Sequence, residues 1–320
     1  MQTLPHADGV VIGGFTDHHV HLQLVDHTLL AGSRLGRVVD LGGNPRFVSS
    51  LRSSLNDQEH AGAARLVSSL RSSLNDQEAS ERRTERVEVT KCDAIRRTSI
   101  EFAGAFLTPV GGYPSDRAWA PAGSFRKIAS EADAAAAVTE MADAGASRIK
   151  VASNSTAGPV FDDDMFRTIV ELAAARGLPI VAHAEGAGEA QRAVRLGASA
   201  LAHAPFTERL SDDEIAEQAA SVVWISTLSI HDATARATAV DNVRRFHAAG
   251  GTVRYGTDMG NGPTPVDLNP HEIDALREAG VDGADLLRIL DPVDPSHPAS
   301  VRLLLPAGDL DPLHAQILKV

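Results

Sequence analysis

The sequence is 320 residues long, 43% of its residues are hydrophobic, and its formal net charge is −12. A chain of this length buries one large core, and no apolar run is long enough to span a bilayer, so a soluble protein without membrane partners is expected. The acidic balance argues against nucleic-acid partners, because nucleic-acid binding relies on clustered Lys and Arg. The single cysteine, Cys92, excludes an internal disulfide framework, and the short polar N-terminus shows no signal peptide. A cytoplasmic location is therefore expected.

Eight short apolar segments alternate with helix-like segments, which predicts an α/β fold of the (β/α)8 TIM barrel type. The predicted strands lie near Phe15 to Leu22, Arg37 to Leu41, Ser99 to Phe106, Arg148 to Ala152, Leu178 to His183, Ala198 to His203, Val222 to Thr227 and Val253 to Asp258. Capping residues and terminal glycines support two of the intervening helices, and two more are predicted towards the C-terminus. The predicted helices are Glu131 to Ala144, Asp162 to Arg176, Pro270 to Ala279 and Gly283 to Leu290.

The whole chain, 1–320, is predicted to be one domain, with the barrel at about 14–290 and a C-terminal tail at about 291–320. An insert at about 44–90 contains a duplication, since Val48 to Glu59 recurs as Val67 to Glu78. The amphipathic spacing of each copy predicts two short helices between the second and third strands. The duplicated segment is either a surface feature without function or a lid or subunit contact, and both interpretations stay open. The oligomeric state also stays open, and a homo-oligomer is possible.

Six polar side chains each stand at the end of a short apolar run: His19, His21, Lys150, His183, His203 and Asp258. The carboxyl ends of barrel strands form the rim on which active sites are built. Side chains alternate faces along a strand, so Asp17, His19 and His21 share one face while His18 points away. Four imidazoles, one carboxylate and one lysine at one rim are typical of a metal site, and Asp17 is placed to orient the histidines.

The chain resembles the amidohydrolase superfamily from Gly14 to about Leu290. The resemblance rests on the H-x-H pair formed by His19 and His21 and on the other four candidate ligands, which follow it in the same order along the sequence as in the family. The segments G-A-S-R-I-K and V-A-H-A-E-G resemble its imidazolonepropionase-like and Xaa-Pro-dipeptidase-like branch. The resemblance implies that the six residues hold two divalent metal ions, zinc first and manganese or iron as alternatives. It also implies that carbon dioxide carboxylates Lys150, since an ammonium group has only donors and cannot bridge two ions. Many relatives carry a flanking β-sandwich, which is expected here to be missing or vestigial because only about 13 residues precede the first strand.

The resemblance implies a hydrolase in which a metal-bridging hydroxide attacks an amide or cyclic C–N bond of a small molecule, with Asp258 as general base and then acid. A lactonase or phosphotriesterase with the same site stays open, and so do a mononuclear deaminase and a metal-binding protein without turnover. Glu185 lies two positions after His183, whereas deaminase relatives usually place an acid three positions after that histidine.

Substrate contacts are expected in the loops that follow the strands. The longest, Leu107 to Pro121, contains Tyr113, Arg117 and Trp119, an aromatic wall and a guanidinium that suit an acyl or aryl group and a carboxylate. His231, after the seventh strand, is a further substrate-binding candidate. The alternative is a loop that simply packs on the barrel.

Overall fold

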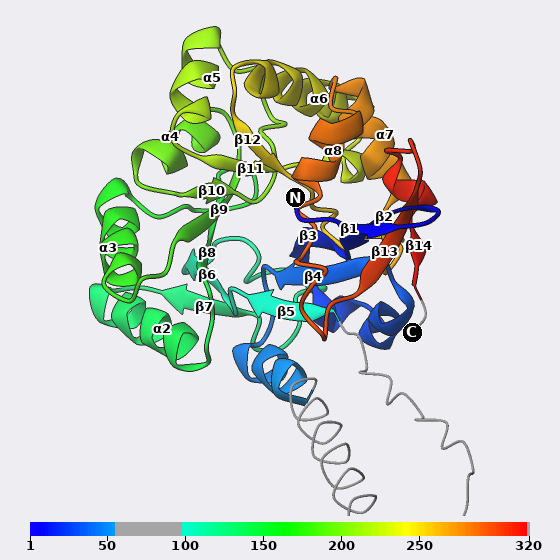
Figure 1. Ribbon diagram of the computed structural model, residues 1–320. Helices are drawn as coiled ribbons and strands as arrows, with labels where there is room; N and C mark the ends of the chain where they lie inside the picture. The colour runs from blue at the N-terminus through cyan, green and yellow to red at the C-terminus, as the bar shows by residue number, and fades with distance from the viewer. Residues whose placement is uncertain (55–97, 319–320) are drawn as a thin grey trace, which may run out of the picture.

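The computed structural model describes residues 1–54 and 98–318. Its main body is α/β and contains a seven-stranded parallel sheet, in the order β12-β11-β10-β9-β8-β6-β7, and a three-stranded parallel sheet, β3-β4-β5 (Figure 1). The strands are β3 (Phe15–Val20), β4 (Leu35–Asp40), β5 (Ser99–Phe102), β6 (Phe106–Pro109), β7 (Phe125–Ile128), β8 (Ile149–Asn154), β9 (Ile180–Glu185), β10 (Ala200–Leu201), β11 (Val223–Ile225) and β12 (Thr252–Arg254).

Backbone hydrogen bonds join the two parallel sheets. The segment after β12 runs beside β3, where His18 N donates to Tyr255 O over 2.9 Å and Val20 forms a parallel bridge with Met259. Ser147 N, just before β8, donates to Phe102 O of β5 over 2.9 Å. One small apolar cluster takes side chains from strands of both sheets or from the residues that follow them: Val39, Leu41, Ala103, Val181, Ala202 and Ile225. The two sheets therefore pack around a shared apolar interior.

Helices cover the outside of the strands (Figure 1). They are α2 (Glu131–Asp143), α3 (Asp163–Ala174), α4 (Glu189–Arg195), α5 (Asp212–Ala219), α6 (Ala233–Ala248), α7 (Pro270–Glu278) and α8 (Gly283–Ile289), with short 3-10 helices η1 (Leu22–Leu24), η2 (His27–Gly32), η3 (Leu228–Ile230) and η4 (Pro312–His314). Ser130 caps α2 by accepting a hydrogen bond from Asp133 N, and Asp162 caps α3 in the same way. Within the described parts of the chain, no helix combines the length and apolarity needed to cross a membrane.

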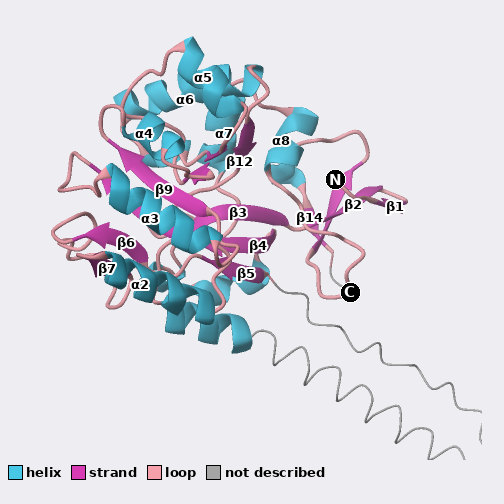
Figure 2. Cartoon of the chain, turned by 90° about the vertical axis from the view of Figure 1, so that its left-hand side faces the viewer, coloured by secondary structure: helices cyan, strands magenta, loops and turns pink. Residues whose placement is uncertain are grey.

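A four-stranded antiparallel sheet lies beside this body (Figure 2). Its order is β1 (Leu4–His6), β2 (Gly9–Gly13), β13 (Arg302–Pro306) and β14 (Gln316–Ile317). In the register of β2 and β13, Val11 pairs with Leu304. Gly14 connects β2 directly to β3, so this small sheet adjoins the amino end of the strand that carries the H-x-H pair.

The predicted α/β class is confirmed, and each predicted strand corresponds to an observed one. The strand predicted over Ser99 to Phe106 is interrupted, because Gly104 takes a φ of 77°, which turns the chain between β5 and β6. The four predicted helices correspond to α2, α3, α7 and α8, whereas β7 was not predicted. Residues 45–54 are helical, but the second copy of the duplication, most of the insert and Cys92 lie outside the described residues. The proposed domain boundaries stay predictions.

Candidate metal centre

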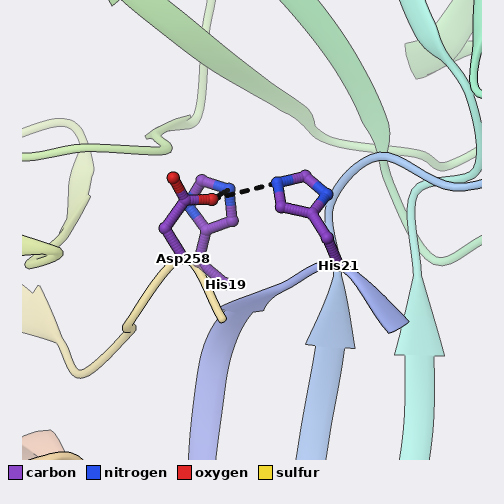
Figure 3. Close-up of side chains that lie close together, drawn as sticks. All are labelled: His19, His21 and Asp258. Atoms are coloured by element: carbon purple, nitrogen blue, oxygen red, sulfur yellow. Dashed lines mark ion pairs between the residues drawn. The ribbon is translucent and has the colours of Figure 1, made fainter. Parts of the chain in front are cut away.

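His19, His21 and Asp258 converge at the carboxyl end of β3 (Figure 3). The Nε2 atoms of His19 and His21 lie 3.1 and 3.0 Å from Oδ1 of Asp258. Asp258 reaches this point from the loop after β12. All three residues are buried, and one possible ligand atom from each lies within 4.8 Å of the others. Two imidazole nitrogens and a carboxylate at this spacing fit a divalent metal ion.

The other ring nitrogens of His19 and His21 fix the orientation of both rings. His19 Nδ1 lies 2.7 Å from Ala202 O, and His21 Nδ1 lies 3.3 Å from Gly42 O. Donation from Nδ1–H to a carbonyl leaves the Nε2 lone pair free for a metal. Asp17 acts on the backbone rather than on a ring, because its carboxylate accepts from His19 N over 3.0 Å. Burial raises the pKa of Asp17 to about 7, although hydrogen bonds from Thr257 and His19 partly oppose this.

A second pair of imidazoles faces the first. His183 Nδ1 lies 3.0 Å from His203 Nε2, and the remaining nitrogen of each ring has a partner of its own. His203 Nδ1 lies 2.9 Å from Thr227 Oγ1, and His183 Nε2 lies 3.2 Å from Glu185 Oε2. If Nε2 of His183 donates to Glu185, its Nδ1 is left as an acceptor. If Nδ1 of His203 likewise donates to Thr227 Oγ1, its Nε2 is an acceptor too, and two acceptor nitrogens 3.0 Å apart fit a shared metal ion.

Lys150 is fully buried on β8, and its Nζ has no hydrogen-bond partner. Burial lowers its pKa to about 7, while the negative charges of Asp258 and Asp40 partly oppose the shift. Buried polar atoms nearly always have partners, so an unpartnered amine indicates a missing group at this position. A deprotonated amine is the form that reacts with carbon dioxide. The residue therefore fits the carboxylated bridge that the resemblance implies.

Asp258 and Thr227 both take left-handed backbone conformations, with φ of 53° and 45°. Such conformations are disfavoured for non-glycine residues and concentrate at functional sites. Burial opposes ionisation of Asp258, but the neighbouring His19, His21 and His203 hold its pKa well below the usual range. Its Oδ2 accepts from Asn261 Nδ2 over 2.8 Å. Asp258 is therefore an oriented, ionised carboxylate.

A cavity of about 530 Å³ opens above these groups, a volume that suits a small-molecule ligand. All six predicted metal ligands line it, and so do the predicted substrate contacts Tyr113 and His231. Arg117 does not line the cavity, because its guanidinium pairs with Asp116 over 3.3 Å and its Cζ lies 5.9 Å from the Tyr113 ring. His18 also stays outside the lining, and its Nε2 lies 3.2 Å from Asp291 Oδ2.

Several lining residues were not predicted from the sequence, namely Leu24, Phe106, Phe206, Ile230 and Asn261. The Gly-rich segment after Asp258 gave a signal for Asn261, since it indicated a turn beside the metal ligands. Phe206 follows His203 by three residues, but its direction into the cavity depends on the loop conformation. No short pattern in the sequence indicates that direction.

No family model and no curated protein matches the sequence. Several solved structures match over almost the whole chain. A Xaa-Pro dipeptidase with bound methionine shares 17% identity at a TM-score of 0.60, over 95% of this chain and 82% of its own. Ochratoxinase from A. niger shares 15% at a TM-score of 0.62, over 97% and 82%.

An adenosine deaminase from Xanthomonas campestris with bound zinc is also similar, with 14% identity and a TM-score of 0.54, over 96% of this chain and 75% of its own. At such low identity a structural likeness establishes the fold rather than the activity. The fold of this chain is the one shared by structures of the amidohydrolase family.

Proposed function

We propose that this protein is a metal-dependent hydrolase of the amidohydrolase superfamily that cleaves an amide or cyclic C–N bond in a small molecule. One observation carries the proposal: the six side chains predicted from the sequence line a single cavity, and among them Lys150 has a buried Nζ without a partner. The Xaa-Pro dipeptidase among the structures of similar fold favours a C–N bond as the target.

The proposal includes a closed (β/α)8 barrel and a reduced flanking sheet. Support for closure comes from the backbone bonds between β3 and the segment after β12, and from the apolar cluster shared by both parallel sheets. His19, His21, His203 and Asp258 lie at or just beyond the carboxyl ends of their strands, where active sites of such barrels are built, whereas Lys150 and His183 lie within β8 and β9. The four-stranded antiparallel sheet is then the counterpart of the flanking sandwich.

Two divalent ions fit the donor set. His19, His21 and Asp258 would hold one ion, His183 and His203 would hold a second, and carboxylated Lys150 would bind both. Imidazole-rich sites suit zinc, with manganese or iron as alternatives. When bound, the ions would lower the pKa of a water molecule towards neutrality and polarise the scissile carbonyl.

The protein's own residues then position the substrate and move the proton. Asp258 is ionised and accepts the proton of the attacking water, and Asn261 holds its second oxygen in place. The same carboxylic acid then delivers the proton to the leaving nitrogen. His231 Nε2 is buried without a partner on the cavity wall, where it can bind a polar atom of the substrate. The rings of Tyr113 and Phe206 line the same cavity and give it apolar surface.

A mononuclear deaminase is the second candidate, because Glu185 lines the cavity and a deaminase shares the fold. In the structure, however, Glu185 Oε2 is held by Asn154 Nδ2 over 2.7 Å and lies 3.2 Å from His183 Nε2. These contacts suit a carboxylate that orients His183 more than one that transfers protons to a substrate.

The test is a substrate panel measured together with metal content. The metal-free protein would be reloaded with zinc or manganese in the presence of bicarbonate, and amides, lactones, phosphotriesters and aminopurines would be compared by kcat/KM. We expect amide hydrolysis that requires two ions per chain. The amide assignment would be contradicted if all the lactones, or all the phosphotriesters, had a higher kcat/KM than the best amide. Ammonia release from an aminopurine with one ion per chain would favour the deaminase.

A further inference from the structure

The charge of the cavity wall restricts the substrate. Among the described residues that line the cavity, and apart from the six proposed ligands, Glu185 is the one side chain with a permanent charge. Arg117, which the sequence predicted as the contact for a substrate carboxylate, pairs with Asp116 and stays outside the lining. The wall therefore offers a substrate an anion but no cation beyond the metal site.

Flat rings form much of the remaining wall. The Tyr113 ring stacks on His183 with centroids 4.9 Å apart, and Trp119 lies 6.0 Å from Tyr113. Phe206 stacks on His231 with centroids 4.1 Å apart, and both residues line the same cavity. Such surfaces favour aromatic groups through stacking and through removal of apolar area from water.

Among the described residues that line this wall outside the ligand set, the single buried side-chain nitrogen or oxygen without a hydrogen-bond partner is His231 Nε2. A neutral imidazole provides one donor or one acceptor, which matches a carbonyl oxygen or an amide N–H. A carboxylate placed here would lose its hydration without gaining a cationic partner, and Glu185 would repel it.

We propose that the substrate carries an aromatic group beside the scissile C–N bond and no free carboxylate. The aromatic group would lie against Tyr113 and Trp119, and an uncharged polar group would bind His231. This inference rests on the proposed hydrolase function and names its substrate class. It replaces the expectation that Arg117 receives a substrate carboxylate.

A matched substrate pair tests the charge requirement. N-benzoylglycine and N-benzoylglycine N-methylamide contain the same benzamide bond and differ in the carboxylate. With the metal-loaded enzyme, release of benzoate from the neutral compound should have a kcat/KM at least fivefold higher than release from the acid. A ratio below five overturns the inference while leaving the hydrolase proposal intact.

A gain-of-function variant sharpens the test. Ile230 lines the cavity on η3, so Ile230→Lys would place a cation where the wall has none. This variant should lower the preference for the neutral substrate at least fivefold, whereas Ile230→Gln, the uncharged control, should change it less than twofold. An unchanged preference in a folded Ile230→Lys protein would contradict the proposed role of wall charge.

Binding gives a readout that does not depend on turnover. Trp119 lines the cavity and is 44% exposed, whereas Trp224 is fully buried and stacks on Phe246. Quenching of Trp119 fluorescence would compare 4-methylacetophenone with 4-acetylbenzoate, two compounds that contain no hydrolysable bond, and Trp119→Phe would identify the signal. The neutral ketone should bind at least fivefold more tightly, and equal or tighter binding of the acid overturns the inference. If neither benzoylglycine compound is cleaved, the failure concerns the proposed function, and this titration still decides the substrate class.

Discussion

The parallel strands carry two layers of charged side chains, and the layers differ in how their charges are matched. Towards the amino ends, Arg37 Nη2 lies 2.6 Å from Asp291 Oδ2, and Arg37 Nη1 lies 3.5 Å from Glu101 Oε1. Glu101 also pairs with Arg148. Towards the carboxyl ends, Lys150 Nζ has no partner and four imidazoles gather around a single aspartate.

The paired layer therefore stabilises the fold, whereas the incompletely paired layer forms the candidate metal centre. In the first layer each charged group faces an opposite charge and is partly exposed, although Arg37 Nε has no hydrogen-bond partner of its own. Partly exposed ion pairs of this kind contribute modest stability. In the second layer, groups are buried without full pairing, and such an arrangement costs stability unless a ligand completes it. Perturbed, incompletely paired groups in a cavity are the physical signature of a reactive site.

The largest expected effect comes from removing the unpaired amine. Lys150→Ala should lose most of the second ion and lower kcat by about 10³-fold, because an ion contributes several kcal/mol to the transition state. Metal analysis and kcat measured on the same sample check this, and short carboxylic acids should restore part of both. Lys127→Ala, at an exposed position on β7, is the control. Full activity with one ion per chain would favour a mononuclear site instead.

Asp258→Asn should have the next largest effect. The amide keeps the size of the side chain but cannot accept the proton, so kcat should fall by on the order of 10²-fold. KM should change less, because the lost interaction belongs to the transition state. Near-normal kcat with full metal occupancy would move the proton-transfer role to another residue, with Glu185 or His231 the next to test.

The pH dependence of stability tests the burial of Lys150. In the folded, metal-free protein, burial lowers the pKa of Lys150 to about 7 from the 10.5 that is ordinary for lysine. The unfolded chain therefore binds the extra proton between these values, and the stability of the wild type rises as the pH increases from about 7 towards 10.5. Metal-free Lys150→Met has no amine at this position, so its stability lacks this dependence on pH.

The stability advantage of metal-free Lys150→Met over the metal-free wild type should be greatest below pH 7 and should shrink as the pH rises. Urea unfolding of both proteins between pH 6 and 10 measures the difference. A difference that does not vary with pH would show that Lys150 titrates normally in the folded state.

The smallest effect is expected in the paired layer. Arg37→Met keeps much of the apolar stem but removes one of the partners of Asp291 and one of the partners of Glu101, which should cost about 1 kcal/mol and lower the Tm by roughly 2–4 °C. The kcat/KM should stay within twofold of the wild type. The control is Arg46→Met at an exposed position. A large loss of activity at unchanged Tm would mean that the two layers are not functionally separate.

Local patterns predicted the strands well, because short apolar runs such as Leu178 to Ala182 are too short for ordinary helices and are bounded by Gly or Pro. Loop directions were harder to predict. Tyr113 and Arg117 lie four positions apart in the same loop, yet Tyr113 alone lines the cavity. Ring stacking on His183 fixes Tyr113 and an ion pair with Asp116 directs Arg117 elsewhere. These contacts form only after the chain has folded.

The pairing of β2 with β13 also affects the order of events during synthesis. Val11 finds its partner, Leu304, only after β13 has emerged from the ribosome. At about 5–20 residues per second, β2 would wait roughly 15–60 s with its backbone unpaired on this side. An exposed strand edge invites pairing with other chains. Chaperone contact with β2 in the nascent chain is thus expected to persist until β13 has been synthesised.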